Sequence, residues 1–342
     1  MRLFYRNYEL PFEYPFTISK GTKTHQPTLV VALEFRGLIG YGEAPAISYY
    51  DVTVDSMIRE LEAKKMMVEK YAFTEPERYW HYLHHLFPKN HFLVCALDMA
   101  YWDLFAKSKR KPLYKFFTES LDTSPLTDYT IGIDSIESMV SKLNRKPWPI
   151  YKVKVGTPDD LQVVTELRKH TEGSIRVDAN AGWTLDQAIV LIPKLHSLGV
   201  EFIEQPLAKD DINGMKTLFE QSESILVADE SCVYEKDVEA CVGQFHGINI
   251  KLTKCGGITP AVRMIRKAKE LGLKVMLGSM NESTIGSAAI AHLSGMLDYM
   301  DCDGPLLLSE DIASGLVYSN GQVQVSEQPG LGVRLFDEIV SL

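Results

Sequence analysis

Hydrophobic and polar residues follow a strand-like pattern over the first 45 or so positions of the chain. The stretch 28–35 is rich in β-branched and apolar residues, and Arg36-Gly37 then provides a turn. Such short-period runs separated by turns are typical of an antiparallel meander. From Val54 to about Phe117 the apolar positions recur with a helical period. Strands followed by helices predict an α+β domain.

Beyond the polar stretch 121–125, short apolar runs alternate regularly with helical segments. The strand-like runs lie near residues 128–133, 150–155, 175–179, 202–205, 225–229, 247–252, 274–279 and 298–302. About eight such units favour a closed (β/α)8-type barrel over an open sheet. We therefore expect an α+β capping domain over residues 1–122 and a barrel over 123–309. The glycine-rich segment 310–342 is expected to pack back on the capping domain.

The amino-acid composition argues against a nucleic-acid-binding, membrane-spanning or disulfide-rich protein. The 342 residues include 45 acidic and 36 basic side chains, a formal net charge of -9, which is unfavourable for binding nucleic acid. No apolar stretch approaches the roughly 20 residues of a spanning helix, and the N-terminus lacks a signal-peptide core. A cytoplasmic protein with no membrane partner is expected. The five cysteines are scattered without a Cys-x-x-Cys pair, which favours neither disulfides nor zinc.

Three acidic residues each end an apolar run. Asp178, Glu204 and Asp229 are 26 and 25 residues apart, which is the length of one strand-plus-helix unit. On neighbouring parallel strands of one barrel, their carboxylates would meet at the C-terminal rim, where such barrels carry their chemistry. Converging carboxylates repel unless a hard cation lies among them, and an all-oxygen ligand set favours Mg²⁺. The pattern predicts a Mg²⁺-dependent enzyme with one ion per active site.

Three lysines lie on the strands that flank these acids. Lys152 and Lys154 alternate on the strand before Asp178, so both side chains point to one face, which we expect to be the barrel interior. Mutual repulsion is expected to lower the pKa of each lysine, as a general base requires. Lys251 follows Asp229 by 22 residues and belongs to the next strand. Lys154 and Lys251 would then flank the metal from opposite sides of the barrel, a geometry that suits proton transfer to either face of one carbon.

At these positions the chain resembles the enolase superfamily, specifically its muconate-lactonizing-enzyme subgroup. The matching motifs are Lys152-Val153-Lys154, Asp178-Ala179-Asn180, Glu204-Gln205-Pro206, Ala228-Asp229-Glu230-Ser231 and Lys251. The resemblance covers essentially the whole chain and implies a modified (β/α)7β barrel with an N-terminal capping domain. It also implies that a substrate carboxylate chelates Mg²⁺ and that a lysine removes the α-proton to give an enolate.

The same resemblance implies the roles of individual residues. Lys154 and Lys251 would be the acid/base pair, and Lys152 would support them. Asn180 and Glu230 would lie near the metal ligands. The subgroup contains dipeptide epimerases, o-succinylbenzoate synthases, N-acylamino-acid racemases and muconate cycloisomerases, so these motifs define a half-reaction but leave the enzyme open.

Asp301 and Asp303 favour one of these enzymes. They alternate on the eighth strand-like run, and dipeptide epimerases carry an Asp-x-Asp at the matching place, where it receives the α-ammonium of the dipeptide. We therefore expect a dipeptide epimerase acting on the C-terminal residue of Ala-Xaa. The alternatives are an N-acylamino-acid racemase or o-succinylbenzoate synthase, and a catalytically silent barrel that binds a metabolite or partner protein. Alternatively, the two aspartates could simply form an acidic turn after the strand, with no role in substrate binding.

The residue Xaa is expected to be small or branched and apolar rather than glutamate. In this superfamily the loop after the first strand, here within 15–24, contacts the substrate side chain. Epimerases specific for Ala-Glu carry an arginine there, and our best match places Gly21 at that position. Ile18 would then form part of an apolar lid, whereas Lys23, or Lys20, could replace the arginine and make the enzyme specific for Ala-Glu. Ser279 and Asn281 at the seventh strand are also expected to line the pocket. The sequence is compatible with a homo-oligomer.

Overall fold

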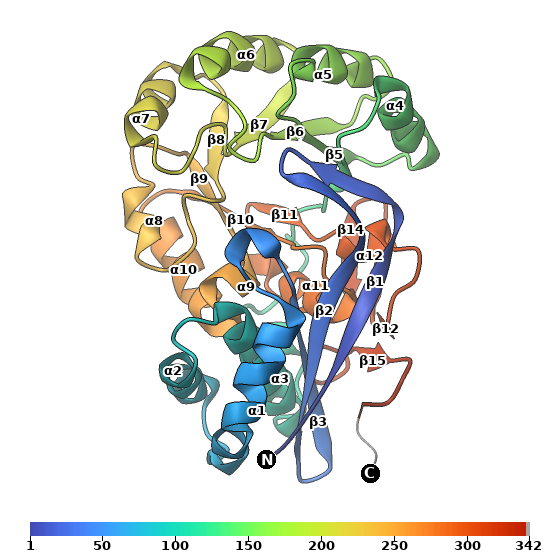
Figure 1. The fold of residues 1–342 in the computed structure, drawn as a ribbon, viewed down its shortest axis with the longest axis vertical. Helices are drawn as coiled ribbons and strands as arrows, with labels where there is room; N and C mark the ends of the chain where they lie inside the picture. Colours follow the sequence, from blue (N-terminus) through green and yellow to red (C-terminus); the bar gives the residue numbers. More distant parts are fainter. Residues whose placement is uncertain (340–342) are drawn as a thin grey trace.

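The first part of the chain forms the predicted antiparallel meander. In the computed structural model, which describes residues 1–339, three long strands pair in the order β1-β2-β3 (Figure 1). Their bounds are β1 (Arg2–Ile18), β2 (Gly21–Phe35) and β3 (Leu38–Pro45). The helices that follow are η1 (Ser48–Tyr50), α1 (Val54–Lys70), α2 (Pro76–Leu86), α3 (His91–Ser108) and η2 (Leu113–Phe116). The predicted α+β organisation of this part is confirmed.

Helix α3 is the central element of this capping part. Its residues are apolar on nearly all sides and are buried almost throughout, because β3 covers one side and the barrel helices another. Gly40 and Gly42 on β3 allow this close approach: a Cβ atom at either position would overlap a backbone carbonyl oxygen of α3, that of Ala100 or Ala96. Helix α3 therefore lies between the capping sheet and the barrel and contacts both.

The second part is a barrel of eight parallel strands. The strands are β4 (Tyr129–Ile131), β5 (Ile150–Lys154), β6 (Ser174–Asp178), β7 (Val200–Glu204), β8 (Ile225–Ala228), β9 (Gly247–Ile250), β10 (Lys274–Gly278) and β11 (Tyr299–Asp301). They pair in sequence order from β4 to β11. The first and last strands meet through a parallel bridge between Thr127 and Met300, and the Cys302 amide donates to Thr127 Oγ1 at 2.8 Å. All eight predicted strand regions are confirmed, and the barrel is nearly closed.

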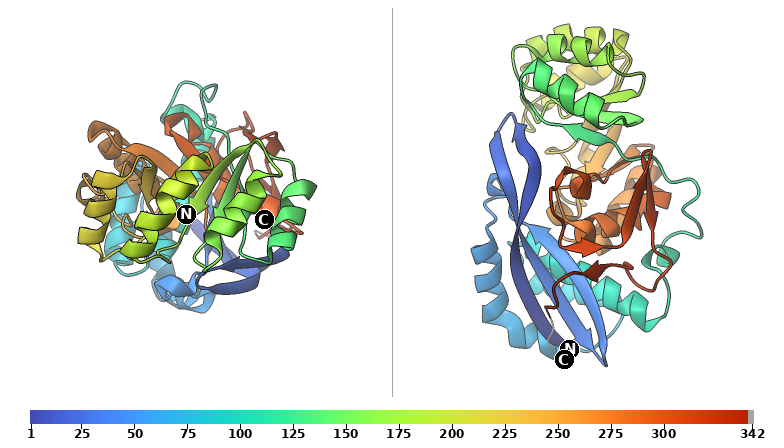
Figure 2. Two further views of the ribbon diagram at one scale, coloured as in Figure 1. Left: turned by 90° about the horizontal axis from the view of Figure 1, so that it is seen from above. Right: turned by 90° about the vertical axis from the view of Figure 1, so that its right-hand side faces the viewer.

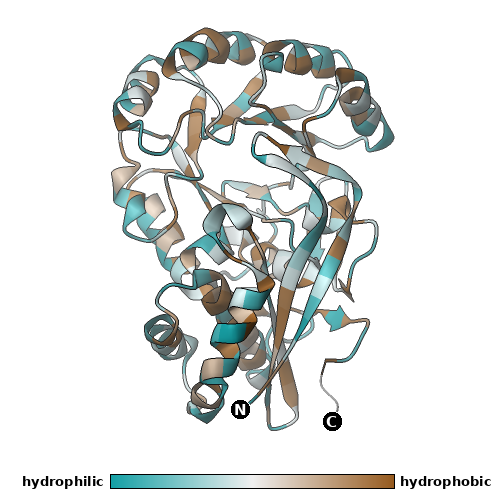
Figure 3. Ribbon diagram, viewed as in Figure 1, coloured by the Kyte–Doolittle hydropathy of each residue, from teal (hydrophilic) through white to brown (hydrophobic). Residues whose placement is uncertain are grey.

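Helices cover the outside of the barrel (Figure 2). They are α4 (Ile136–Arg145), α5 (Asp160–Arg168), α6 (Leu185–Ser197), α7 (Ile212–Gln221), α8 (Asp237–Ala240), α9 (Leu252–Cys255), α10 (Ile258–Glu270), α11 (Thr284–Ala291), η3 (Ser294–Met296) and α12 (Gly304–Leu307). Helix α6 buries Ala188, Ile192 and Leu195, a spacing that forms one stripe, and hydrophilic and hydrophobic colours alternate along the outer helices (Figure 3). None of the helices in residues 1–339 is both long and apolar enough to span a bilayer.

The end of the chain returns to the capping part. It contains β12 (Ala313–Ser314), β13 (Leu316–Ser319), β14 (Gln322–Val325) and β15 (Arg334–Leu335). The Leu331 amide donates to Asp103 on α3 at 2.7 Å, and the Tyr114 hydroxyl donates to Glu327 at 2.9 Å. Through these contacts the last segment lies against α3 and η2. Its residues 340–342 lie outside the described part, and the packing of 310–342 as a whole stays a prediction. The boundaries at 122/123 and 309/310 stay a prediction.

The capping part also reaches the top of the barrel. The end of the β1–β2 hairpin lies beside the barrel strands at their C-terminal ends (Figures 1 and 2). The Ile133 amide, which follows β4, donates to the carbonyl of Thr17 at 2.9 Å. The hairpin is thereby placed over the rim where the predicted catalytic residues emerge.

Candidate active site

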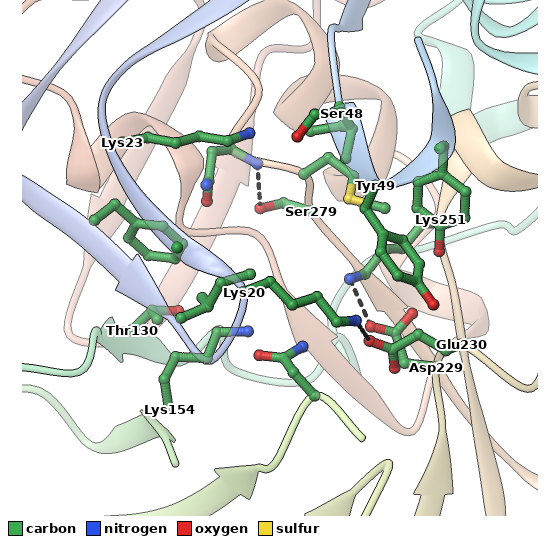
Figure 4. Close-up of a pocket in the computed structure, with 18 of the residues that line it drawn as sticks. Lys20, Lys23, Ser48, Tyr49, Thr130, Lys154, Asp229, Glu230, Lys251 and Ser279 are labelled. Carbon is green, nitrogen blue, oxygen red and sulfur yellow. Dashed lines mark hydrogen bonds and ion pairs between the residues drawn. The ribbon is translucent and has the colours of Figure 1, made fainter. Parts of the chain in front are cut away.

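A cavity of about 240 Å³ lies between the capping hairpin and the C-terminal ends of the barrel strands (Figure 4). The capping part contributes Phe16, Ile18, Lys20, Gly21, Thr22, Lys23, Ile47, Ser48, Tyr49 and Tyr50. The barrel contributes Thr130, Lys154, Asn180, Asp229, Glu230, Lys251, Ser279, Met280, Asn281, Asp301 and Asp303. Eleven of the fourteen predicted site residues line this cavity, and the other three, Lys152, Asp178 and Glu204, are buried and bonded to residues around it.

The three predicted metal ligands come together at one point. Asp178 ends β6, Glu204 ends β7 and pairs with Asp178 in register, and Asp229 directly follows β8. All three are buried, and one oxygen from each lies within 4.8 Å of the others. Burial and the neighbouring Asp178 charge raise the pKa of Glu204 to about 7. The carboxylates therefore repel one another as the spacing predicted.

The lysines supply the opposing charge. Lys154 Nζ lies 2.6 Å from Asp178 Oδ2, and Lys251 Nζ lies 2.8 Å from Asp229 Oδ2. Lys152 is buried and does not line the cavity, and its Nζ lies 2.8 Å from Glu204 and 3.2 Å from Asp178. Burial disfavours the ionised form of Asp178, but Lys154 and Lys152 outweigh burial and lower its pKa to about 2. The acids and lysines thus form one compact ionic cluster.

Two of the lysines approach the cluster from opposite sides. Lys154 belongs to β5 and Lys251 follows β9, and three strands separate β5 from β9 in either direction around the barrel. Figure 4 shows the two side chains across the cavity from each other. Lys251 lies one residue beyond the end of β9 and is the N-cap residue of the helical turn α9.

The expected lowering of the lysine pKa is wrong for Lys152. Burial favours the neutral form of Lys152, but the charges of Asp301, Glu204 and Asp178 dominate and hold its pKa well above the ordinary value. Burial is likewise outweighed at Lys251, whose pKa is raised mainly by Asp229. Repulsion from Lys152 acts to lower the pKa of Lys251, but it is weaker than the attraction of Asp229. A cation among the acids would compensate the carboxylate charge and weaken this effect.

The residues present fit a magnesium ion. The donor set is three carboxylates, which are hard oxygen ligands suited to Mg²⁺. Two buried oxygens beside them, Asn180 Oδ1 and Glu230 Oε2, have no hydrogen-bond partner among the described residues. Both side chains line the cavity next to Asp229. Oxygen atoms left without donors at this point suit further ligands or the water shell that Mg²⁺ usually keeps.

The backbone after two of the acids adopts an unusual conformation. Asn180 has a φ of 45° and Gln205 has a φ of 38°, both in the left-handed region. The Gln205 side chain accepts hydrogen bonds from the amides of Asp229 at 3.0 Å and Ser231 at 3.1 Å. Gln205 therefore fixes the backbone of Asp229, the next predicted metal ligand. Sequence analysis gave it no role, although it belongs to the Glu-Gln-Pro motif.

Two further buried residues hold the acids and were missed. Asn249 on β9 donates to Glu204 Oε1 at 2.8 Å. Lys254 donates to Asp229 Oδ1 and to its carbonyl oxygen, both at 2.6 Å, which leaves Oδ2 facing Lys251. Lys254 is three residues beyond Lys251, so it lies on the same side of a helical turn, and this spacing was the available signal.

Asp301 and Asp303 lie together at the opposite wall of the cavity. Asp301 Oδ2 lies 2.9 Å from Lys152, whereas its buried Oδ1 has no hydrogen-bond partner among the described residues. Asp303 accepts from the Thr130 amide at 2.6 Å, and burial together with Asp301 raises its pKa to about 8. Buried Asp128 lies beside the pair. Such a group of carboxylates favours a cationic ligand, because added positive charge would relieve the repulsion among them.

The two loop lysines differ in their surroundings. Lys20 Nζ lies 2.8 Å from Glu230 and 3.8 Å from the centre of the Tyr49 ring, so its charge is already paired with the barrel. Lys23 is half-buried, donates to Gln26 at 3.1 Å, and burial lowers its pKa. Within the described residues, Lys23 forms no ion pair with a carboxylate. Lys23 is therefore the loop lysine available to a substrate, whereas Lys20 connects the hairpin to the rim.

Comparison with known proteins agrees with this architecture. Residues 2–117 match the N-terminal domain of the mandelate racemase/muconate lactonizing enzyme family, and residues 135–339 match the enolase C-terminal domain-like family. An L-Ala-D/L-amino acid epimerase of Flavobacterium johnsoniae is 47% identical over 335 residues, covering 98% of this chain and 100% of the relative.

Two solved structures have closely similar folds. One is a substrate-liganded complex of the L-Ala-D/L-Glu epimerase from Bacillus subtilis (TM-score 0.93, 29% identity, 97% of this chain and 98% of the other). The other is a dipeptide epimerase from Cytophaga hutchinsonii complexed with Mg and D-Ala-L-Val (TM-score 0.91, 27% identity, 98% and 96%). The chain belongs to the mandelate racemase/muconate lactonizing enzyme family of the enolase superfamily.

Proposed function

We propose that this protein is a Mg²⁺-dependent dipeptide epimerase that inverts the α-carbon of the second residue of Ala-Xaa. The observation that carries the proposal is the pair Lys154 and Lys251 on opposite sides of three converging carboxylates. A base on each side of one carbon is what inversion requires. The relatives named as epimerases of alanine dipeptides, and the structural neighbour crystallised with Mg and a dipeptide, support it.

Each part of the cluster has a distinct task. Asp178, Glu204 and Asp229 would hold the ion, which when bound supplies Lewis-acid stabilisation of the charge that develops on the substrate carboxylate. Neutral Lys154 takes the α-proton at Nζ from one isomer, while protonated Lys251 delivers a proton from its Nζ to the opposite face. In the reverse direction the two lysines exchange roles. Lys152 neutralises the acids and holds Asp178, Glu204 and Asp301 in place.

Asp301 and Asp303 would bind the α-ammonium of the dipeptide. The partnerless, buried Oδ1 of Asp301 can accept a hydrogen bond from the ammonium, and both carboxylates line the cavity. An N-acylamino-acid racemase or an o-succinylbenzoate synthase acts on substrates without this cation, and would leave the two aspartates unused. The pair therefore favours a free dipeptide.

Acetylating the dipeptide amine tests this assignment. We expect kcat/KM to fall by an amount corresponding to about 2–5 kcal/mol, because a desolvated charged contact is lost. The comparison is kcat/KM for free and N-acetylated forms of the same dipeptide. Asp303→Asn should weaken the discrimination between the two, and equal kcat/KM for both substrates in the unaltered enzyme would favour an N-acylamino-acid racemase.

The second residue of the substrate is proposed to be small or branched and apolar. Ile18 of the hairpin, Ile47 and Met280 supply apolar surface to the cavity, and Phe16 adds an aromatic wall. An apolar pocket discriminates weakly, by roughly 1–3 kcal/mol per methylene, so a broad substrate range is expected. Lys23 could meet a glutamate carboxylate only as a point charge, because an ammonium lacks the planar fork of arginine.

Substrate competition decides between these two options. We expect kcat/KM for Ala-Val and Ala-Ala to exceed that for Ala-Glu. Lys23→Met should leave Ala-Val turnover within a few-fold of the original value, because an apolar side chain makes no use of the ammonium. A strong preference for Ala-Glu that disappears in Lys23→Met would instead show that this lysine recognises the glutamate side chain.

The direct test of the proposed function is solvent exchange. A library of Ala-Xaa dipeptides incubated with the Mg²⁺-loaded enzyme in D₂O should gain deuterium at the α-carbon of the second residue as it epimerises. A catalytically silent barrel would bind ligands without any exchange, and that result would refute the proposal.

A further inference from the structure

The position of Lys251 depends on a very short segment of chain. Strand β9 ends at Ile250, and Lys251 is the N-cap residue of α9, which is one helical turn followed by Gly256 and Gly257. An isolated turn of helix is unstable in water, because nucleation costs more than one turn of hydrogen bonds returns. The turn must therefore be held by tertiary contacts.

The capping part supplies some of these contacts, in addition to the hydrogen bonds that Lys254 within the turn donates to barrel residues. Asp98, fully buried on α3, accepts from the Thr259 amide at 2.9 Å and from its hydroxyl at 2.7 Å. Trp80 on α2 donates from its indole nitrogen to the carbonyl of Gly256 at 2.8 Å. Both residues belong to the first 117 positions, whereas the segment they hold belongs to the barrel. Hydrogen bonds from two capping helices thus fix the end of the turn that carries Lys251.

The Asp98 side chain packs closely against the backbone at Gly257. Gly257 has a φ of 124°, a conformation that L side chains rarely adopt, and a Cβ atom there would overlap Asp98 Oδ2. The close approach of Asp98 therefore requires glycine at position 257, and the hydrogen bonds to Thr259 connect Asp98 to the chain that follows the turn.

Lys154 is positioned in a different way. It is the last residue of β5 and pairs in register with Asp178 of β6, so the sheet itself fixes its backbone, whereas Lys251 lies beyond the paired residues of β9. We infer that Asp98 is a positioning residue for Lys251, by which the capping part places one of the two bases but not the other. The inference rests on the proposed two-base epimerisation.

Deuterium exchange measured separately on the two isomers tests this asymmetry. The initial rate of α-deuteration of unreacted substrate in D₂O reports the lysine that faces each isomer, and Lys154→Ala and Lys251→Ala assign the isomers to the lysines. In Asp98→Asn, exchange of the isomer facing Lys251 should fall roughly 10- to 100-fold, as a displaced group predicts. Exchange of the isomer facing Lys154 should stay within about twofold of the original rate, by the same reasoning.

Asp103→Asn is the matched control. Asp103 is also buried on α3 but accepts from the Tyr41 and Leu331 amides, away from the Lys251 turn. Any general loosening of α3 in this variant should slow both isomers equally. Trp80→Phe, which removes the hydrogen bond to Gly256 and keeps an aromatic ring beside Arg263 and His84, should reproduce the selective loss and replaces Asp98→Asn if that variant does not fold.

Each remaining outcome has one meaning. If the folded variants at Asp98 and Trp80 slow both isomers equally, or neither, the inference is overturned while the proposed function stands. If the unaltered enzyme exchanges no dipeptide α-proton, the proposed function fails first and the inference fails with it.

Discussion

Replacing Lys154 or Lys251 by alanine is expected to reduce epimerisation by about 10²–10⁴-fold, because each removes the acid or base that serves one face of the α-carbon. The two lysines approach from β5 and from the end of β9, so neither can reach the face that the other serves. Each variant should nevertheless exchange the α-proton of one isomer with solvent. Circular dichroism or chiral chromatography measures epimerisation, and NMR in D₂O measures exchange.

The two alanine variants are expected to differ in which substrate isomer still exchanges its α-proton. Lys154→Ala and Lys251→Ala should retain exchange of opposite isomers, which separates loss of one base from a general loss of structure. Lys169→Ala is a suitable control, because this exposed lysine pairs only with Glu166 on the outside of the barrel and such pairs contribute little. Unimpaired epimerisation by either active-site variant would exclude a two-base mechanism.

Removing the metal is expected to have a comparable effect. Chelation by EDTA should abolish turnover and added Mg²⁺ should restore it, because three buried carboxylates converge within 4.8 Å. Asp229→Asn should weaken Mg²⁺ binding by more than the roughly 10- to 100-fold loss typical of outer-shell changes, since it removes an anionic ligand. Calorimetric titration with Mg²⁺ measures this without reference to activity.

Asp211→Asn provides the control for that titration. Asp211 caps α7 on the outside of the barrel by accepting from the Gly214 amide, and asparagine is an equally good cap. Its Mg²⁺ affinity should equal that of the unaltered protein. Full activity in thoroughly metal-free enzyme would contradict the metal assignment.

Much of the fold could be predicted because the spacing of hydrophobic residues along the chain follows the local secondary structure. A strand with one buried face and a helix with one buried stripe each reveal themselves within a dozen residues, and repetition of the pair predicts a barrel. The same repetition placed Asp178, Glu204 and Asp229, because carboxylates at equal intervals of one unit must emerge at one rim. The role of the glycines of β3 could not be predicted from local spacing, because these glycines allow contact with a helix more than 50 positions away in the sequence.

The sequence by itself thus determined the barrel with its N-terminal α+β part, and it pointed to the proposed metal ligands and to the proposed catalytic lysines. Only the tertiary structure decided how those groups act on one another. The pKa values of Lys152 and Lys251 are raised because the barrel brings each ammonium against carboxylates from other strands, an effect that spacing along the chain does not contain. Asp98 was unrecognisable for the same reason, because its hydrogen-bond partner Thr259 is distant in sequence. For Lys254 the spacing from Lys251 was a signal, but its contact with Asp229 depends on the folded chain.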